Sequence, residues 1–117
     1  MAAKIAKASY DPEEDILYVR LGRPIKDSLQ FGDFIVDFAS DDRIVGLEIA
    51  NASRNLLESL PASADPRKLL TTVRTARFAT SEARGLVTIR VAFDISLGGM
   101  RYQPALHVPL PQAVLAR

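Results

Sequence analysis

The sequence has no cysteine and only one histidine, His107, among its 117 residues. The absence of cysteine excludes disulfides, thiolate metal sites and cysteine nucleophiles. A lone histidine cannot form a zinc site with a second one, and no Gly-x-Ser-x-Gly elbow indicates a serine hydrolase. We therefore interpret His107 as a structural residue of an apolar strand, and we expect no catalytic residue, no metal and no cofactor.

Other signals are also missing. The sequence contains neither GxxxxGK[ST] nor GxGxxG, so no phosphate-binding loop is indicated. No stretch approaches the roughly 18 apolar residues of a membrane span, and no apolar run follows the first lysines as it would in a signal peptide. Together with the lack of cysteine, this predicts a cytoplasmic protein that does not enter a membrane.

The composition is that of a globular protein, with 48% hydrophobic and 25% charged residues. This length predicts a single domain over residues 1–117. The charge is uneven, since residues 1–60 hold seven Lys/Arg and eleven Asp/Glu, whereas residues 61–117 hold eight and three. The two halves either neutralise each other, within a chain or across a dimer, or form a partner surface.

Apolar and polar residues alternate over much of the chain, a pattern typical of half-buried strands. We expect about seven strands, at residues 4–10, 15–21, 33–39, 43–50, 72–80, 85–96 and 101–108. Short helices are predicted at 53–60, with Ser53 as N-cap, and from Asp65-Pro66. Residues 24–32 remain a connection of uncertain form, and residues 66–80 suit either a helix or a strand.

These elements predict an α+β fold, a mostly antiparallel β meander with one or two short helices in the middle. Residues 8–60 form a meander plus a helix, and residues 66–110 form a β-rich extension. Shifting the sequence by 70 aligns residues 6–21 with 76–91, with Ala and Arg identities at the first and fifteenth positions. Two identities in sixteen are close to what any two hairpins give, so an internal duplication stays open.

Four acids, Asp11, Glu13, Glu14 and Asp15, lie within five positions at the start of the chain. A calcium loop requires alternating oxygen ligands, a glycine and a distal glutamate, whereas a proline stands at 12. Proline and aspartate both favour turns. We interpret the cluster as a solvated turn between two strands.

Asp37 and Glu48 each interrupt an apolar strand. If these two strands pair, both acids come close on the polar face of the sheet. A like-charge pair would raise the pKa of one acid or recruit a cation. Arg20 or Arg43 could equally neutralise them.

The second half carries arginines that could contact phosphates or an acidic partner. We consider Arg74, Arg77 and Arg90 the possible partner-binding residues, with Arg84 and Arg101 nearby in sequence. The net charge is only +1 and no aromatic stacking platform accompanies these arginines, so nucleic-acid binding is not favoured.

The string YDPEEDILYVRL at residues 10–21, followed by DFIVDF, SDDR and IVGLEIANAS, resembles the short prokaryotic family known as domain of unknown function 2283. The resemblance covers residues 8–53. It implies a small β meander closed by a helix, without established catalytic residues, and some members resemble antitoxin partners of small toxins. The positions that match are Tyr10, Asp11, Asp15, Leu17, Tyr18, Asp37, Gly46, Glu48, Ile49, Ala52 and Ser53.

The leading functional hypothesis is a non-enzymatic, protein-binding or regulatory module, antitoxin-like, whose small basic protein partner docks on the acidic N-terminal half. One alternative is a self-associating structural domain, a homodimer whose arginines serve the dimer contact. An exposed edge strand at either end could also pair with a second copy. The other is a small metal-binding protein or enzyme that uses Asp37 and Glu48.

Overall fold

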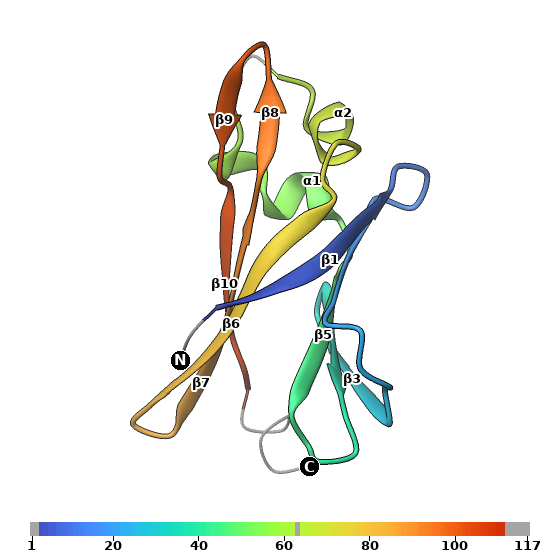
Figure 1. Ribbon diagram of the computed structural model, residues 1–117, viewed down its shortest axis with the longest axis vertical. Coiled ribbons are helices and arrows are strands. Elements are labelled where there is room, and N and C mark those ends of the chain that lie inside the picture. Colours follow the sequence, from blue (N-terminus) through green and yellow to red (C-terminus); the bar gives the residue numbers. More distant parts are fainter. Residues whose placement is uncertain (1–2, 63, 112–117) are drawn as a thin grey trace.

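The computed structural model describes residues 3–62 and 64–111, and in this part of the chain it has ten strands and three short helical segments (Figure 1). The strands are β1 (Lys4–Asp11), β2 (Ile16–Arg20), β3 (Asp27–Phe31), β4 (Phe34–Phe38), β5 (Ile44–Ile49), β6 (Thr75–Ala83), β7 (Leu86–Phe93), β8 (Ile95–Leu97), β9 (Met100–Tyr102) and β10 (Ala105–Pro109). The helical segments are α1 (Ala52–Asn55), η1 (Leu57–Ser59) and α2 (Pro66–Leu70).

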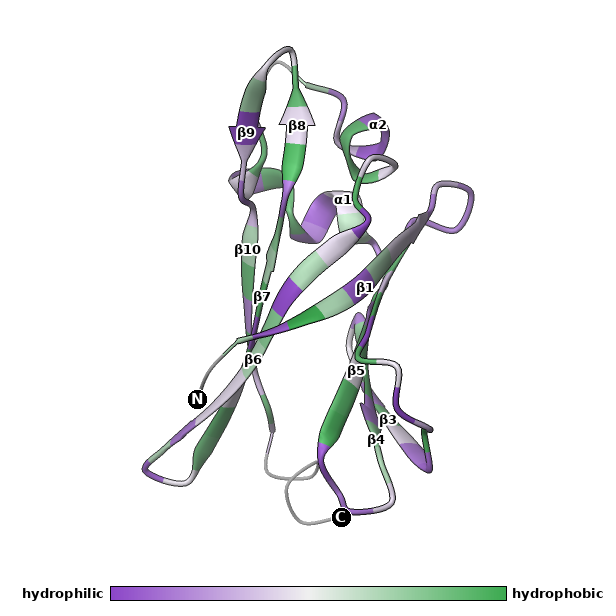
Figure 2. Cartoon of the chain, in the orientation of Figure 1, coloured by the Kyte–Doolittle hydropathy of each residue, from purple (hydrophilic) through white to green (hydrophobic). Residues whose placement is uncertain are grey.

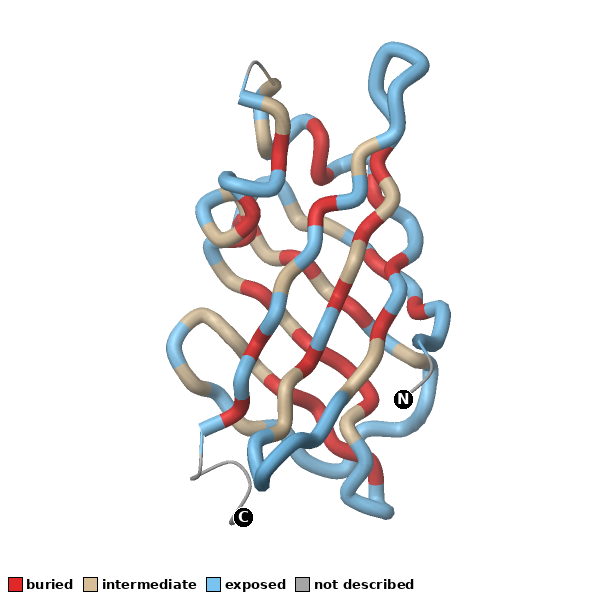
Figure 3. The backbone as a smooth tube through the Cα atoms, turned by 90° about the vertical axis from the view of Figure 1, so that its left-hand side faces the viewer, coloured by how far each residue is buried: buried red, intermediate tan, exposed pale blue. Residues whose placement is uncertain are grey.

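Eight of the strands form one antiparallel sheet in the order β10-β7-β6-β1-β2-β5-β4-β3, and β8 and β9 form a separate two-stranded ribbon. The two parts of the chain join where β1 pairs with β6, with Ala6 opposite Ala76. The sheet curls, so that strands of the two halves cross as two layers (Figure 3). The apolar core lies between these layers.

Burial alternates along the strands (Figure 3), and so does hydropathy (Figure 2), since successive side chains point to opposite faces. Leu17 and Val19 on β2, and Leu47 and Ile49 on β5, are fully buried on the inner face. The three helical segments lie together at one end of the sheet (Figure 1) and contribute buried leucines such as Leu56 to the same core.

The expected mostly antiparallel β architecture with short helices is confirmed, but the strand count is wrong because the described residues form ten strands and not about seven. The sheet is also not a continuous meander, since β2 neighbours β5 and β1 neighbours β6. β3 was not predicted, since only Leu29 and Phe31 of this edge strand are even half-buried. Without a strong apolar alternation, only its pairing with β4 defines it as a strand.

Two predicted strands are each divided in two. The 85–96 strand is broken at Asp94 and the 101–108 strand at Gln103-Pro104. Pro104 has no N–H to give to a ladder, and its carbonyl accepts from the Phe93 N–H at 2.9 Å. The Asp94 carboxylate accepts from Gln103 at 3.0 Å, which fixes this break from both sides.

The start of α2 agrees with the prediction, because Asp65 accepts from the Arg67 N–H at 3.1 Å and Pro66 occupies the first helical position. The start of α1 does not. Ser53 lies inside the helix, and Asn51 precedes it with φ 49° and no side-chain capping bond. Among the helices of the described residues, none is long and apolar enough to cross a membrane.

The two halves repeat one arrangement. β1, β2 and β5 neighbour one another in the sheet as β6, β7 and β10 do, and the β1–β6 pairing joins the two sets. Lys7 lies opposite Arg20 on β2, whereas Arg77 lies opposite Ala92 on β7. The shift of 70 therefore relates β1 to β6 but becomes 72 between β2 and β7, because the second hairpin has two more residues between equivalent positions, although its turn is shorter. Arg20 corresponds to Ala92 in position, and not to Arg90.

Candidate functional site

Asp15 is the most thoroughly bonded acid of the molecule's N-terminal hairpin. It lies in the turn between β1 and β2 with φ 57°, and it is only 6% exposed. Tyr10 Oη donates to its Oδ1 at 2.5 Å, and Ser53 donates to it through its backbone N–H (3.1 Å) and its hydroxyl (2.7 Å). The Arg67 guanidinium lies 3.8 Å from Oδ2. The solvated-turn interpretation is therefore wrong for Asp15, which joins the hairpin to α1 and α2.

These contacts also determine the protonation states of Asp15 and Tyr10. Burial opposes the charge of Asp15, but the hydrogen bonds from Tyr10 and Ser53 outweigh it and lower the pKa of this carboxyl. Burial and the hydrogen bond to Asp15 raise the pKa of Tyr10. Asp15 thus stays ionised at neutral pH, and it replaces the missing side-chain cap of α1 by accepting from the Ser53 N–H.

The rest of the acidic cluster behaves as a turn. Asp11 Oδ1 accepts from the backbone N–H groups of Glu13 at 2.9 Å and Glu14 at 3.2 Å. Both glutamates are exposed. This local bonding is what the aspartate-proline pattern predicted.

Glu48 and Asp37 lie on the outer face of the sheet as diagonal neighbours, because Asp37 pairs with Gly46 and Ile35 pairs with Glu48. Arg20 Nη2 lies 3.4 Å from Glu48 Oε1, and its guanidinium lies 5.0 Å from the centre of the Tyr18 ring. Glu48 is therefore neutralised by Arg20, one of the two arginines considered from the sequence.

Asp37 has a different environment. It is 4% exposed, its Oδ1 accepts from the Ser28 hydroxyl at 2.7 Å, and its Oδ2 has no hydrogen-bond partner within the described part of the chain. Arg43 pairs instead with Asp41, at 3.6 Å. The two acids are thus on one face but share no partner, and the described residues contain no group of three His, Cys, Asp or Glu side chains placed to hold a metal.

Asp33 and Asp41 are also engaged by side chains of the N-terminal half. Asp33 Oδ2 lies 2.8 Å from an Arg54 nitrogen and accepts from Asn55 at 3.0 Å, and hydrogen bonds from Asn55, Arg54 and Asn51 lower its pKa. Asp41 accepts from Arg23 at 3.0 Å. Three acids of residues 1–60, Asp33, Asp41 and Glu48, are therefore paired with arginines from the same residues.

The structure separates the three candidate arginines. Arg74 Nη1 donates to the carbonyl oxygens of Thr71 at 2.7 Å and Val73 at 3.0 Å, which ties it to the loop before β6. Arg77 and Arg90 come together on the outer face of β6 and β7. They are diagonal neighbours, since Arg77 pairs with Ala92 and Arg90 with Ala79.

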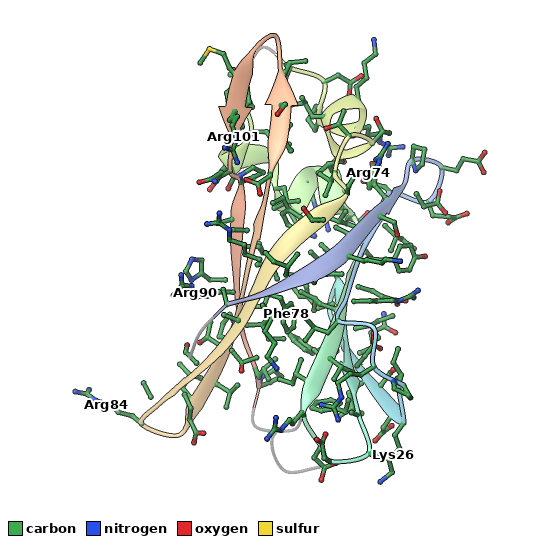
Figure 4. The ribbon with its side chains drawn as sticks, in the orientation of Figure 1. Lys26, Arg74, Phe78, Arg84, Arg90 and Arg101 are labelled. Atoms are coloured by element: carbon green, nitrogen blue, oxygen red, sulfur yellow. The ribbon has the colours of Figure 1, made fainter. Side chains whose placement is uncertain are left out.

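These two arginines border a depression of about 230 Å³ on the outer face, hereafter the basic depression. Its lining includes Arg77, Arg90, His107, Ala79, Ala92 and Ala105. Figure 4 shows that Arg90 points away from the core, whereas Arg84 stands at the tip of the β6–β7 hairpin and Arg74 near the helices. Within residues 3–62 and 64–111, neither Arg77 nor Arg90 takes part in an ion pair.

The sequence interpretation did not place His107 at this site. It lies on β10 directly opposite Arg90 and is exposed, so it is not a core residue. The signal was present in the alternation, because Leu106 and Val108 flank it and Val108 is buried. A residue between two inward-pointing neighbours on a strand must point outward.

Comparison with known proteins gives a match for the N-terminal part of the chain. No curated protein sequence and no solved structure matches. The matched part runs from β1 to the first turn of α1 and contains Tyr10, Asp15 and Ser53. Residues 7–53 match the family described as Protein of unknown function (DUF2283), which confirms the resemblance over this segment.

Proposed function

We propose that this chain is a non-enzymatic binding module that takes an acidic protein partner on the outer face of β6, β7 and β10. The observation that carries this proposal is the uneven neutralisation of charge. Asp33, Asp41 and Glu48 of the N-terminal half pair with arginines of the same half, and Asp15 contacts Arg67. Arg77 and Arg90, in contrast, have no ion-pair partner among the described residues. An acidic partner would supply the missing charge.

The neighbourhood of these arginines suits a protein partner. Ile5 lies opposite Arg77 on β1 and is 69% exposed. Protein interfaces combine apolar contacts with arginine, and they are enriched in arginine relative to lysine. No Phe, Tyr or Trp side chain lines the basic depression, so its lining lacks the large aromatic platform on which single-stranded nucleic acids stack.

The other hypotheses fit the geometry less well. A small basic partner on the N-terminal half would find Asp33, Asp41 and Glu48 already engaged. A regulatory, antitoxin-like role is compatible with binding through the basic face. Chemistry at Asp37 and Glu48 would have to displace Ser28 and Arg20 from their carboxylates.

Self-association is the second candidate, favoured by the two ends of the sheet. β3 and β10 each have a single neighbouring strand in the described structure. Such edges can pair with a second copy of the chain. Sedimentation of the full chain at micromolar concentration distinguishes the two functions, because a homodimer needs no second protein.

The binding proposal is tested by affinity capture from a lysate of the source organism. The baits are the wild-type chain, the double variant R77Q/R90Q, and R84N as a control that removes one arginine at the hairpin tip. We expect wild type and R84N to retain the same acidic protein. The double variant should retain an amount of that protein that is smaller by about tenfold or more. Cross-links from Lys7, which lies on the outer face of β1, should map onto that protein. Equal recovery by R77Q/R90Q would overturn the proposal.

A further inference from the structure

The outer faces of the two halves can be compared position by position, because their strands pair in the same register. In the first half Tyr18 lies opposite Glu48, and in the second half Arg90 lies opposite His107. Two residues further along, Arg20 lies opposite Gly46 in the first half. Ala92 lies opposite Ala105 at the same place in the second half.

The first half holds a closed polar set at these positions. The Arg20 guanidinium contacts the Glu48 carboxylate at 3.4 Å and lies over the Tyr18 ring. In this set the chain provides both the cation and the anion. The exposed face is therefore neutralised without any ligand.

The second half lacks both members of that ion pair. Ala92 stands at the place of Arg20, and His107 stands at the place of Glu48. Three alanines leave the basic depression of about 230 Å³ open between Arg77, Arg90 and His107. The carboxylate that completes the first half has no counterpart here.

We infer that the basic depression binds an oxyanion, a carboxylate or a phosphate, which takes the role that Glu48 has in the first half. This inference rests on the proposed function and names the chemistry by which the partner is held. Each guanidinium offers several coplanar N–H donors that match an oxyanion in a bidentate way. The imidazole of His107 adds a further donor. Neighbouring cations on one sheet face repel one another unless an anion lies between them.

Asp94 is a carboxylate of the same chain that could compete with a ligand for Arg77, but it is already engaged. The Asp94 carboxylate accepts hydrogen bonds from Gln103 at 3.0 Å and from Arg101 at 3.2 Å, and these bonds lower its pKa. Arg77 affects the pKa of Asp94 only through space and makes no hydrogen bond to it among the described contacts. The small side chains of the floor, Ala79 and Ala92, allow an anion to approach both guanidinium groups.

The test is an NMR titration of the ¹⁵N-labelled full chain with sodium phosphate and with sodium acetate, against sodium chloride at constant ionic strength. We expect saturable shifts of the amides of Ala79, Ala92 and Ala105 with an oxyanion and not with chloride. Binding should weaken about tenfold or more in R77Q/R90Q and stay unchanged in R84N. R90K keeps the charge but loses the planar donor pair, and it should weaken binding by an intermediate factor.

Two further probes identify the source of the anion, a glutamate-rich peptide and the same peptide with phosphoserine. Tighter binding of either peptide than of the free anion indicates a side chain of a protein, whereas equal binding indicates a free anion. No saturable shift with any of the probes, or equal affinity in R77Q/R90Q, would overturn the inference. Anion binding together with unchanged capture of the protein by R77Q/R90Q would overturn only the proposed function. Loss of capture without any anion binding would overturn only the oxyanion site.

Discussion

Gly46 is required by the carboxylate that lies opposite it. A Cβ atom at this position would lie 2.6 Å from Asp37 Oδ2 and 3.2 Å from the Val19 carbonyl oxygen. The first contact is far below any normal separation, and Asp37 is buried and held by Ser28. We expect G46A to lower the free energy of unfolding by about 1–3 kcal/mol, the usual cost of overpacking.

A double-mutant cycle with D37A, measured by urea denaturation, shows how much of the cost of G46A comes from the contact with the Asp37 carboxylate. Removing the carboxylate removes the shorter of the two contacts, so G46A should cost about 1 kcal/mol less in the D37A background. The contact with the Val19 carbonyl remains, and the recovery is therefore partial. Strictly additive costs would contradict this explanation.

Residue roles that depend on local bonding could be predicted from the sequence. Asp11 bonds the backbone two and three residues ahead, and Asp65 does the same at the start of α2. The role of Asp15 could not be predicted in this way. Its partner Ser53 is 38 residues away, and only the fold brings the two together. The same holds for Asp37, whose environment depends on the register of β3, β4 and β5.

At the scale of the elements, the β6–β7 hairpin closes through the two residues Arg84 and Gly85, with φ values of 55° and 78°. Two positive φ angles are typical of a type I′ turn, in which Asn-Gly is the preferred pair. A long side chain in this left-handed region is strained, whereas asparagine adopts it readily. We expect R84N to raise the free energy of unfolding by about 0.5–1 kcal/mol.

The matched control for this turn is R84Q, which removes the charge but keeps a long, unbranched side chain. Thermal and urea unfolding of the two variants distinguish backbone strain from charge repulsion. Stabilisation by R84N alone supports the strain argument. If R84Q stabilises the protein equally, the repulsion among the arginines is the cause.

Strands were predictable where one face is deeply buried, as in β2, β5 and β7, because alternation then reflects the core directly. The alternation of apolar and polar residues does not predict β3, which is an edge strand with little burial. It also merged β7 with β8, since Ile95 continues the apolar alternation across the break at Asp94. Hydrogen bonding, and not hydropathy, ends the strand there.

At the scale of the whole molecule, the sheet shows how the two halves of the chain correspond, a relation that the sequence alone only suggests. The alignment by 70 residues is correct for β1 and β6, where Ala6 meets Ala76 across the joint. It places Arg90 in register with Arg20, although the second hairpin is two residues longer between equivalent positions, which moves the correspondence of Arg90 to Tyr18. A two-residue change in a turn keeps every side chain on its own face. The core pattern therefore survives, while the outer faces of the two halves differ in charge.

Stability should fall at acid pH because several carboxyl groups have lowered pKa values. These groups are Asp15, Asp33, Asp41 and Asp94. An aspartate in the unfolded chain titrates near pH 3.9, so below that value the unfolded state binds more protons than the folded state. Stability is then fully present above about pH 5 and decreases as the pH falls through the folded pKa values.

Asp15 should dominate this dependence, because it is buried while Asp41 and Asp94 are exposed to solvent, where ion pairs contribute little. The variant D15N loses the charged acceptor of Tyr10 and Ser53, and we expect it to be less stable than wild type by about 1.5–3 kcal/mol at pH 7. Its unfolding free energy should approach that of wild type as the pH falls from the unfolded value of about 3.9 through the lowered pKa of Asp15, because wild-type Asp15 then also becomes neutral. Urea denaturation of both proteins between pH 7 and pH 3 measures this difference, and D41N serves as the exposed control. A difference that stays constant over this range would show that Asp15 contributes through its shape and not through its charge.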